Sequence, residues 1–191
     1  MDYKEINGDL FTAPQGYCLA HCISGDFALA AGIAVEFDKR FNMRERLKDY
    51  YDTPDCPSII KIDNVFNLIT KERGHQRPTY DNLYQALWEM RKDIETDSIK
   101  KLAMPQIGCG LDGLNWNIVK AMIKEVFSDM DIEIVIYIYD PNQSKNDEEW
   151  EVDDSWEDEP DSEFGEQMTF DDYAYCGSCE NNPRHYCGYY D

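Results

Sequence analysis

The sequence lacks any long apolar run. No apolar stretch among its 191 residues approaches the roughly 18 residues that a membrane-spanning helix needs. Its first residues, MDYKEINGDLF, carry charges where a secretory signal peptide has an apolar stretch. Hydrophobic residues still make up 42% of the chain, enough for one ordinary domain with a core. We therefore expect a soluble cytoplasmic protein with no membrane partner.

Basic residues are scarce, and most sharply so near the C-terminus. The net charge is -21. Residues 1–145 hold 17 Lys and Arg against 23 Asp and Glu, whereas residues 146–191 hold Arg184 alone against 16 acids. A nucleic-acid binder needs a basic stripe for phosphate contacts, and none is present, so we expect no intrinsic nucleic-acid binding. The change in charge predicts a boundary between a domain at 1–141 and a tail at 142–191.

A disulfide framework is also missing. The cysteines number seven, an odd count, and four of them are scattered among hydrophobic segments, which is typical of free buried thiols in a reducing compartment. These four are Cys18, Cys22, Cys56 and Cys109.

The tail at 142–191 is dense in acids and shows no periodicity, so its composition predicts disorder. Its aromatic residues could dock a protein partner or fold back onto the domain; they include Trp150, Trp156, Phe164 and Phe170. At its end, a C-x2-C pair is half of a tetrahedral zinc site that a His-x-Cys pair would complete, but the short gap between the pairs and the awkward His-x-Cys chelate favour free thiols. We expect no metal at this cluster, which comprises Cys176, Cys179, His185 and Cys187.

Strand-type and helix-type segments alternate along residues 1–141. Strands are predicted at 3–7, 17–22, 59–62, 65–70, 101–104 and 132–139, and helices at 32–41, 44–51, 80–94 and 117–127. Thr79 is the predicted N-cap of the third helix. This alternation predicts an α/β sandwich with a mostly parallel central sheet.

Three segments carry glycine or polar residues just after a predicted strand, where open α/β sheets bind ligands. They are 20–34, 68–73 and 107–113, and the last has three glycines that could form an anion-binding nest. Each segment alone is more often a tight turn than a phosphate cradle. The three segments together, in this order, indicate a phosphate-binding site more specifically than any one of them.

These segments resemble the macrodomain family, within it the branch of the terminal ADP-ribose protein glycohydrolase. The resemblance runs from residue 6 to 137 and rests on the blocks GDLF, LAHCIS, AGIAV, LITK, PTY and IGCGLD. It implies a three-layer α/β/α sandwich with a mixed central sheet, a cleft for ADP-ribose at the strand ends, and no cofactor. One departure is Ala30, where the family more often has glycine.

The resemblance also assigns roles to residues. Lys71 would be the nucleophile at the distal ribose and Asp112 would move protons, which is sensible chemistry for an amine and a carboxylate. Asp9 would accept the adenine amino group. The implied ligand-binding residues are Asp9, Leu10, His21, Ser24, Gly32, Ile33, Ala34, Thr70, Pro105, Ile107, Gly108, Cys109, Gly110 and Leu111.

The resemblance implies a hydrolase that removes ADP-ribose from acidic side chains or from related esters such as O-acetyl-ADP-ribose. Its partner would be ADP-ribose or an ADP-ribosylated macromolecule. Two alternatives stay open: a phosphatase of ADP-ribose 1''-phosphate, and a non-catalytic reader or sponge of ADP-ribose. Lys71 and Asp112 favour the enzyme, because a reader needs no amine at the anomeric carbon.

Overall fold

A central six-stranded sheet organises the domain. The computed structural model describes residues 1–50 and 56–139. The strands run in the order β1-β6-β5-β2-β4-β3, and all neighbours are parallel except the antiparallel pair β3 and β4. Their bounds are β1 Asp2–Asn7, β2 Cys18–Ser24, β3 Ser58–Ile62, β4 Val65–Lys71, β5 Lys101–Pro105 and β6 Glu133–Ile138.

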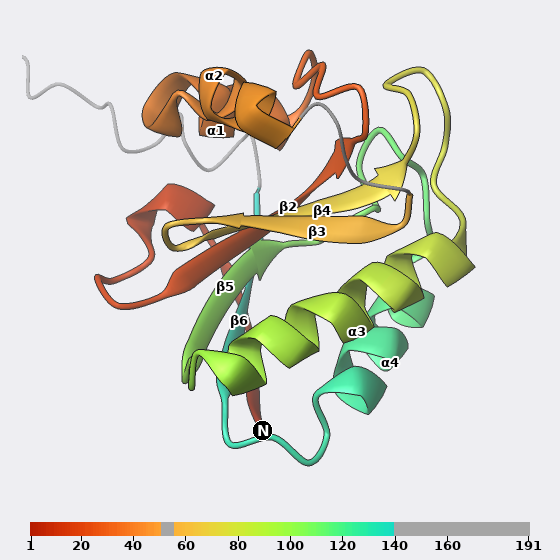
Figure 1. Ribbon diagram of the computed structural model, residues 1–191. Coiled ribbons are helices and arrows are strands. Elements are labelled where there is room, and N and C mark those ends of the chain that lie inside the picture. The colour runs from red at the N-terminus through yellow and green to blue at the C-terminus, as the bar shows by residue number, and fades with distance from the viewer. Residues whose placement is uncertain (51–55, 140–191) are drawn as a thin grey trace, which may run out of the picture. The chain divides into compact units, whose positions relative to one another are not determined.

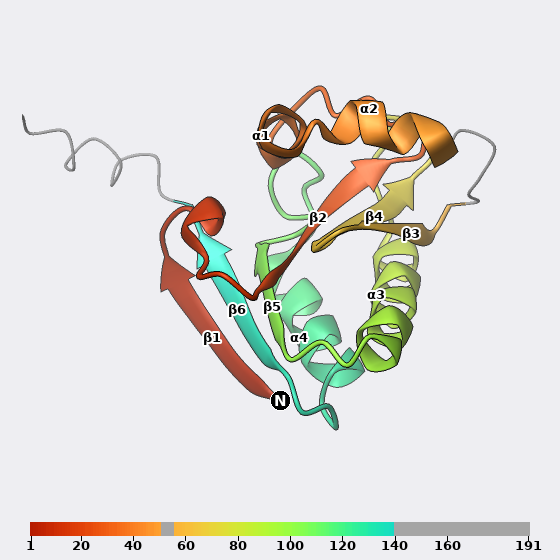
Figure 2. The same ribbon diagram turned by 60° about the vertical axis from the view of Figure 1, so that its left-hand side comes forward.

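Helices cover both faces of the sheet. Helices α1 and α2 lie over one face and α3 and α4 over the other (Figures 1 and 2). Their bounds are α1 Ile33–Phe41, α2 Met43–Leu47, α3 Tyr80–Thr96 and α4 Trp116–Val126, with short 3-10 turns at Leu10–Thr12 and Lys48–Tyr50. The mixed sheet between two helical layers confirms the predicted three-layer sandwich.

Each face of the sheet carries its own hydrophobic core. On one face, Leu87 of α3 and Ile123 of α4 are fully buried against strand residues such as Ile134. On the other, Phe37 of α1 packs with residues of β2 and β4. A strand between two such layers is apolar on both faces, which explains the nearly continuous apolar run of β6.

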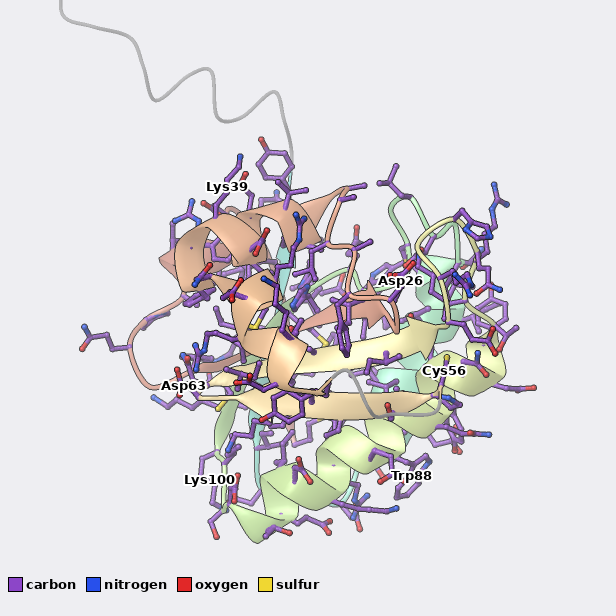
Figure 3. The ribbon with its side chains drawn as sticks, turned by 45° about the horizontal axis from the view of Figure 1, so that its top comes forward. Asp26, Lys39, Cys56, Asp63, Trp88 and Lys100 are labelled. Atoms are coloured by element: carbon purple, nitrogen blue, oxygen red, sulfur yellow. The ribbon has the colours of Figure 1, made fainter. Side chains whose placement is uncertain are left out.

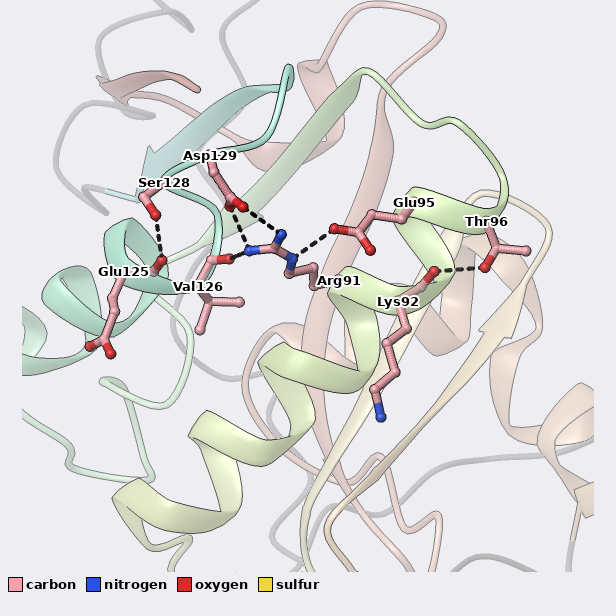
Figure 4. A network of polar contacts seen from close by, with 8 residues as sticks. All are labelled: Arg91, Lys92, Glu95, Thr96, Glu125, Val126, Ser128 and Asp129. Atoms are coloured by element: carbon pink, nitrogen blue, oxygen red, sulfur yellow. Dashed lines mark hydrogen bonds and ion pairs between the residues drawn. The ribbon is translucent and has the colours of Figure 1, made fainter.

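Helix α3 is fixed at both ends by polar contacts. The Thr79 side chain accepts a hydrogen bond from the Asn82 N–H, which confirms the predicted N-cap. Near the other end, Arg91 donates to the Val126 carbonyl (2.5 Å) and pairs with Asp129 (2.7 Å), and so joins α3 to the end of α4 (Figure 4).

One helix is shorter than the pattern at 44–51 predicts. Asn42 adopts a left-handed backbone (φ 50°) that separates α1 from α2, and α2 ends at Leu47 before a 3-10 turn. No helix in the described part of the chain is long and apolar enough to cross a membrane. The predicted boundary at 141 and the tail at 142–191 lie outside the described residues.

Candidate functional site

A cavity of about 930 Å³ opens at the carboxyl ends of the strands. Its walls are the segments that follow β1, β2, β4 and β5, as expected for a sheet whose parallel strands end along one edge. Its volume is at the upper end of the range of roughly 300–1,000 Å³ that small-molecule and cofactor sites occupy.

Lys71 and Asp112 meet in this cavity. Lys71 is the last residue of β4, Asp112 lies in the turn after β5, and Lys71 Nζ is 2.5 Å from Asp112 Oδ1. Their side chains are only 15% and 17% exposed, so the pair is largely shielded from water yet lines the cavity. An amine that touches a carboxylate can pass a proton to it, and a deprotonated amine is a nucleophile. The pair can therefore supply both a nucleophile and a proton carrier.

Two thiols lie beside this pair, but they are poor nucleophiles. Burial raises the pKa of Cys22 to about 12 and that of Cys109 to about 11, and the negative charge of Asp112 adds to both shifts. Only the thiolate attacks carbon efficiently, so both groups are protonated and unreactive at neutral pH. This leaves Lys71 as the candidate nucleophile at this end of the cavity.

Farther along the cavity, two glycine-containing segments approach each other: the first contains Gly32 at the start of α1, and the second is 107–113 after β5. Gly32 (φ 60°) is the N-cap of α1 and offers no side-chain cap, and the N–H groups of Ile33 and Ala34 precede the first turn's bond from Val35 N–H to the Gly32 carbonyl, so they have no intrahelical partner. The Leu111 side chain of the second segment reaches within 3.6 Å of the position that a Gly32 Cβ would take. Uncapped helix N-termini bind phosphate well, so this gap suits a pyrophosphate.

Gly108 shapes the second segment. Its backbone is left-handed (φ +68°), and a Cβ there would lie 2.9 Å from the Leu114 side chain. Leu114 N–H in turn donates to the Gly108 carbonyl (2.9 Å), which closes the turn. Only glycine fits this position without strain, and this explains the glycine-rich sequence here.

Asp9 lies at the end of the cavity near β1. Its Oδ1 accepts the Phe11 N–H (3.0 Å) and so caps the 3-10 turn, while its Oδ2 lies 3.8 Å from Arg40. The Arg40 guanidinium stacks over the Phe11 ring at 4.3 Å. Asp9 keeps 45% of its side chain exposed, so lone pairs remain for a ligand donor.

Most of the residues implied by the resemblance line this cavity. They are Asp9, Leu10, Ser24, Gly32, Ile33, Ala34, Lys71, Pro105, Ile107, Gly108, Cys109, Gly110, Leu111 and Asp112. The structure thus brings the two expected catalytic side chains and the two expected phosphate-binding segments to one place. What each contributes to a ligand stays a prediction.

His21 and Thr70 require correction, because neither lines the cavity. Both side chains are fully buried within the strands. The His21 ring stacks on Phe37 with 3.8 Å between centroids, and its Nε2 donates to Asn67 Oδ1 (2.8 Å). Burial lowers the pKa of His21 to about 4, against a smaller opposing effect of the Asn67 bond. Both residues belong to the core beneath the site.

Several lining residues were not predicted from the sequence. The segment after β4 contributes Gly74, His75, Gln76 and Arg77, and Arg40 and Tyr139 lie farther along the cavity. The rule that ligand sites lie just beyond strand ends would have found 74–77, had it been followed past Arg73.

No metal site supplements this cavity. Across residues 1–50 and 56–139, no group of three or more His, Cys, Asp or Glu side chains is placed to hold a metal ion. The cysteine and histidine cluster at 176–187 lies outside the described residues.

Comparison with known proteins gives consistent results. No family model matches the chain. It is 42% identical over 134 residues to the ADP-ribose glycohydrolase OARD1 of Homo sapiens and to that of Bos taurus; each alignment covers 69% of this chain and 88% of the relative.

Solved structures share the fold. The macrodomain of Mycobacterium tuberculosis DarG has a TM-score of 0.64 at 22% identity and covers 71% of this chain and 96% of its own. The macrodomain of Thermus aquaticus DarG has a TM-score of 0.62 at 21% identity, covering 73% and 98%. Thermosipho africanus DarTG, solved in complex with ADP-ribose, has a TM-score of 0.58 at 19% identity, covering 69% of this chain and 40% of its own.

Proposed function

The chain belongs to the macrodomain family, in the branch of the ADP-ribose glycohydrolases, and on that premise we propose that it is a hydrolase that releases ADP-ribose from acidic side chains of proteins or from related esters. Lys71 is the nucleophile in this proposal. The observation that carries it is the contact of 2.5 Å between Lys71 Nζ and Asp112 Oδ1 inside the cavity. A protein that only binds ADP-ribose has no use for a shielded amine and carboxylate in contact.

In the first step, Asp112 takes a proton from the Lys71 ammonium. The free amine attacks the anomeric carbon of the distal ribose, the C–N bond forms, and the bond from that carbon to the carrier oxygen breaks. The carrier leaves as a carboxylate, which is a good leaving group at neutral pH because its conjugate acid has a pKa near 4. The product of this step is ADP-ribose joined covalently to Lys71.

In the second step, Asp112 moves the protons that open the sugar and allow water to release Lys71. Water adds to the former anomeric carbon, the C–N bond breaks, and free ADP-ribose and lysine result. One carboxylate can do both tasks because it holds a proton between the two steps.

The rest of the cavity supports the choice of ligand. The Asp9 carboxylate lines one end of the cavity and suits the adenine amino group, and Lys71 and Asp112 line the other end. Between them, the uncapped N-terminus of α1 and the segment around Gly108 suit the pyrophosphate. In this arrangement the distal ribose reaches Lys71.

A panel of four substrates tests the proposal. The full-length protein is incubated with glutamate-linked, serine-linked and thymidine-linked ADP-ribose and with ADP-ribose 1''-phosphate, and released ADP-ribose and phosphate are measured by liquid chromatography. We expect release from the glutamate ester. Release of phosphate alone would instead identify a phosphatase, and binding without release from any substrate would identify a reader.

Two Lys71 variants complete the test. Lys71→Ala should lose hydrolysis but retain ADP-ribose binding, because the amine is needed for bond formation and not for holding the pyrophosphate. Lys71→Arg should also be inactive, since a guanidinium stays charged and is not a nucleophile. Turnover in either variant would contradict a lysine nucleophile.

A further inference from the structure

Two arginines differ from the other cationic side chains of the described residues. Nearly all of those have a carboxylate within 4.0 Å. Lys101 and Lys124 have none but lie over the rings of Tyr17 and Tyr3. In residues 1–50 and 56–139, Arg73 and Arg77 have neither kind of partner, although the charge of Arg73 acts on the Asp26 carboxylate from beyond 4.0 Å. The chain has 39 Asp and Glu against 18 Lys and Arg, so the lack of an ion pair at these two arginines does not reflect a shortage of carboxylates.

Both arginines lie on the segment that follows Lys71 at the end of β4. Arg73 follows Lys71 by two residues. Arg77 lines the cavity, and its guanidinium lies 4.0 Å from the position that a Cβ on Gly113, the residue after Asp112, would take. Both are exposed. The charge of Arg77 therefore lies at the cavity, beside the turn that holds Asp112, and that of Arg73 lies at the start of the same short segment.

The segment that carries them is held in place. Arg73 N–H donates to the Gln76 side chain (2.8 Å), and Gln76 N–H donates to the Arg73 carbonyl (3.0 Å). Gly74 N–H donates to the Asp26 carboxylate (3.0 Å). The backbone between the two arginines is therefore fixed before any ligand binds, so little backbone entropy is lost when the guanidiniums bind a partner.

We infer that Arg73 and Arg77 bind carboxylates of the carrier, so that the substrate is an ADP-ribosylated residue within an acidic stretch of protein. The inference rests on the proposed function and extends it to the carrier. A guanidinium binds carboxylate by two parallel hydrogen bonds, which suits acidic residues on either side of the modified one. A polynucleotide fits less well, because its affinity depends on many phosphate contacts and the chain has a net charge of -21.

Matched peptides test this inference. One peptide carries ADP-ribosylated glutamate between Glu and Asp residues, and the other carries it between Gln and Asn residues. For the full-length protein we expect kcat/KM to be roughly three- to tenfold higher on the acidic peptide, as one or two exposed ion pairs provide. The ratio should fall as salt is raised, because salt screens such pairs.

Variants assign the preference to the two arginines. The double variant Arg73→Gln/Arg77→Gln should bring the ratio between the peptides close to one. The control Lys101→Gln/Lys124→Gln makes the same change in net charge at residues outside the cavity lining, and should keep the ratio of the wild type.

The possible failures are distinguishable. If the wild type releases ADP-ribose from both peptides at equal kcat/KM, or if the arginine variant keeps the preference, the inference is wrong and the proposed function stands. If neither peptide is hydrolysed, the proposed function itself fails. A third arm uses a thymidine-linked oligonucleotide: a preference for it over the acidic peptide that disappears in the arginine variant would show a nucleic-acid carrier and overturn the inference.

Discussion

The Asp26 carboxylate accepts a hydrogen bond from the Gly74 N–H, 48 residues away in the sequence, at 3.0 Å. Its other oxygen accepts the Ser24 hydroxyl at 2.5 Å. Burial alone would raise the pKa of Asp26, but the hydrogen bonds from Ser24 and from the N–H groups of Gly74 and Ala28 outweigh it and hold the pKa below its usual value. Asp26, at the end of β2 (Figure 3), thus ties together the segments after β2 and β4 that wall the cavity.

Replacing Asp26 should loosen both segments. We expect Asp26→Ala to lower the free energy of unfolding by about 1 kcal/mol, because the N–H groups that it serves lose their acceptor and only water replaces it. ADP-ribose affinity should fall as well, since the cavity wall is less ordered before binding. Urea denaturation and calorimetric titration measure the two effects. Asp131→Ala is the control: Asp131 is 94% exposed and pairs with Lys100 at the surface, so stability should change little.

Two glycines of one segment should respond differently to alanine. Gly108→Ala forces a left-handed alanine and a Cβ 2.9 Å from Leu114, and should cost about 1–3 kcal/mol of stability. Gly110→Ala meets nothing within 4 Å and has no left-handed backbone, so the fold should tolerate it. Thermal unfolding of both variants with and without ADP-ribose checks this. Equal melting temperatures for the two would show that the turn adjusts freely.

The buried imidazole of His21 should make the fold sensitive to acid. Its pKa is about 4 in the folded protein and 6.5 when unfolded, so the unfolded chain takes up the proton first as pH falls. The contribution of neutral His21 to the free energy of unfolding is fully present above pH 6.5 and is lost as the pH falls further. The loss reaches about 3 kcal/mol near pH 4.

His21→Phe separates this effect from other titrations. Phenylalanine keeps the stacking on Phe37 but has no proton to bind, although it leaves Asn67 Oδ1 without its donor. The variant should therefore be less stable at pH 7 and lose less stability than the wild type between pH 7 and 4.5. Urea denaturation at several pH values gives both slopes. Parallel slopes would show that His21 does not titrate as its burial requires.

The helices and strands could be predicted well from the sequence because the apolar residues follow the helical or the strand periodicity clearly. The six strands and four helices appear where alternation placed them, and apart from the end of α2 their ends differ by at most two residues. The larger error was at 44–51, where helical residues continue past Leu47 but the chain turns into a 3-10 geometry. Such an end depends on tertiary packing around Leu47, which local propensity does not contain.

The site was predictable where its residues follow strand ends, and much less so elsewhere. Lys71 and Asp112 are recognisable by their blocks, but their contact depends on β4 and β5 lying on either side of β2. His21 and Thr70 sit in the same blocks yet point into the core, because neighbouring strand residues face opposite sides of a sheet. The role of Asp26 arises from its hydrogen bond with Gly74, 48 positions away, which no local sequence pattern predicts.

Asp112→Ala gives the sharpest test of the chemistry. In the first step water can replace Asp112 as the acceptor of the Lys71 proton, whereas the second step depends on the carboxylate. Its loss should therefore slow bond formation but stall the cycle after the amine has bonded to the sugar. The variant incubated with a glutamate-linked substrate should then gain the mass of one ADP-ribosyl unit, visible by intact mass spectrometry and mapped to Lys71 by proteolysis.

The double variant Lys71→Ala/Asp112→Ala is the control, and it should gain no mass because the nucleophile is gone. The wild type should show no lasting adduct, since it completes the second step. An adduct on another residue would show that this residue, and not Lys71, is the nucleophile. An Asp112→Ala protein that binds ADP-ribose but is inactive and unmodified would mean that the carboxylate is needed before bond formation, as the acceptor of the Lys71 proton or as the base for an attacking water. Rapid-quench measurement of the wild type under single turnover then separates these two roles, because a lysyl adduct releases the carrier before free ADP-ribose, whereas attack by water releases both together.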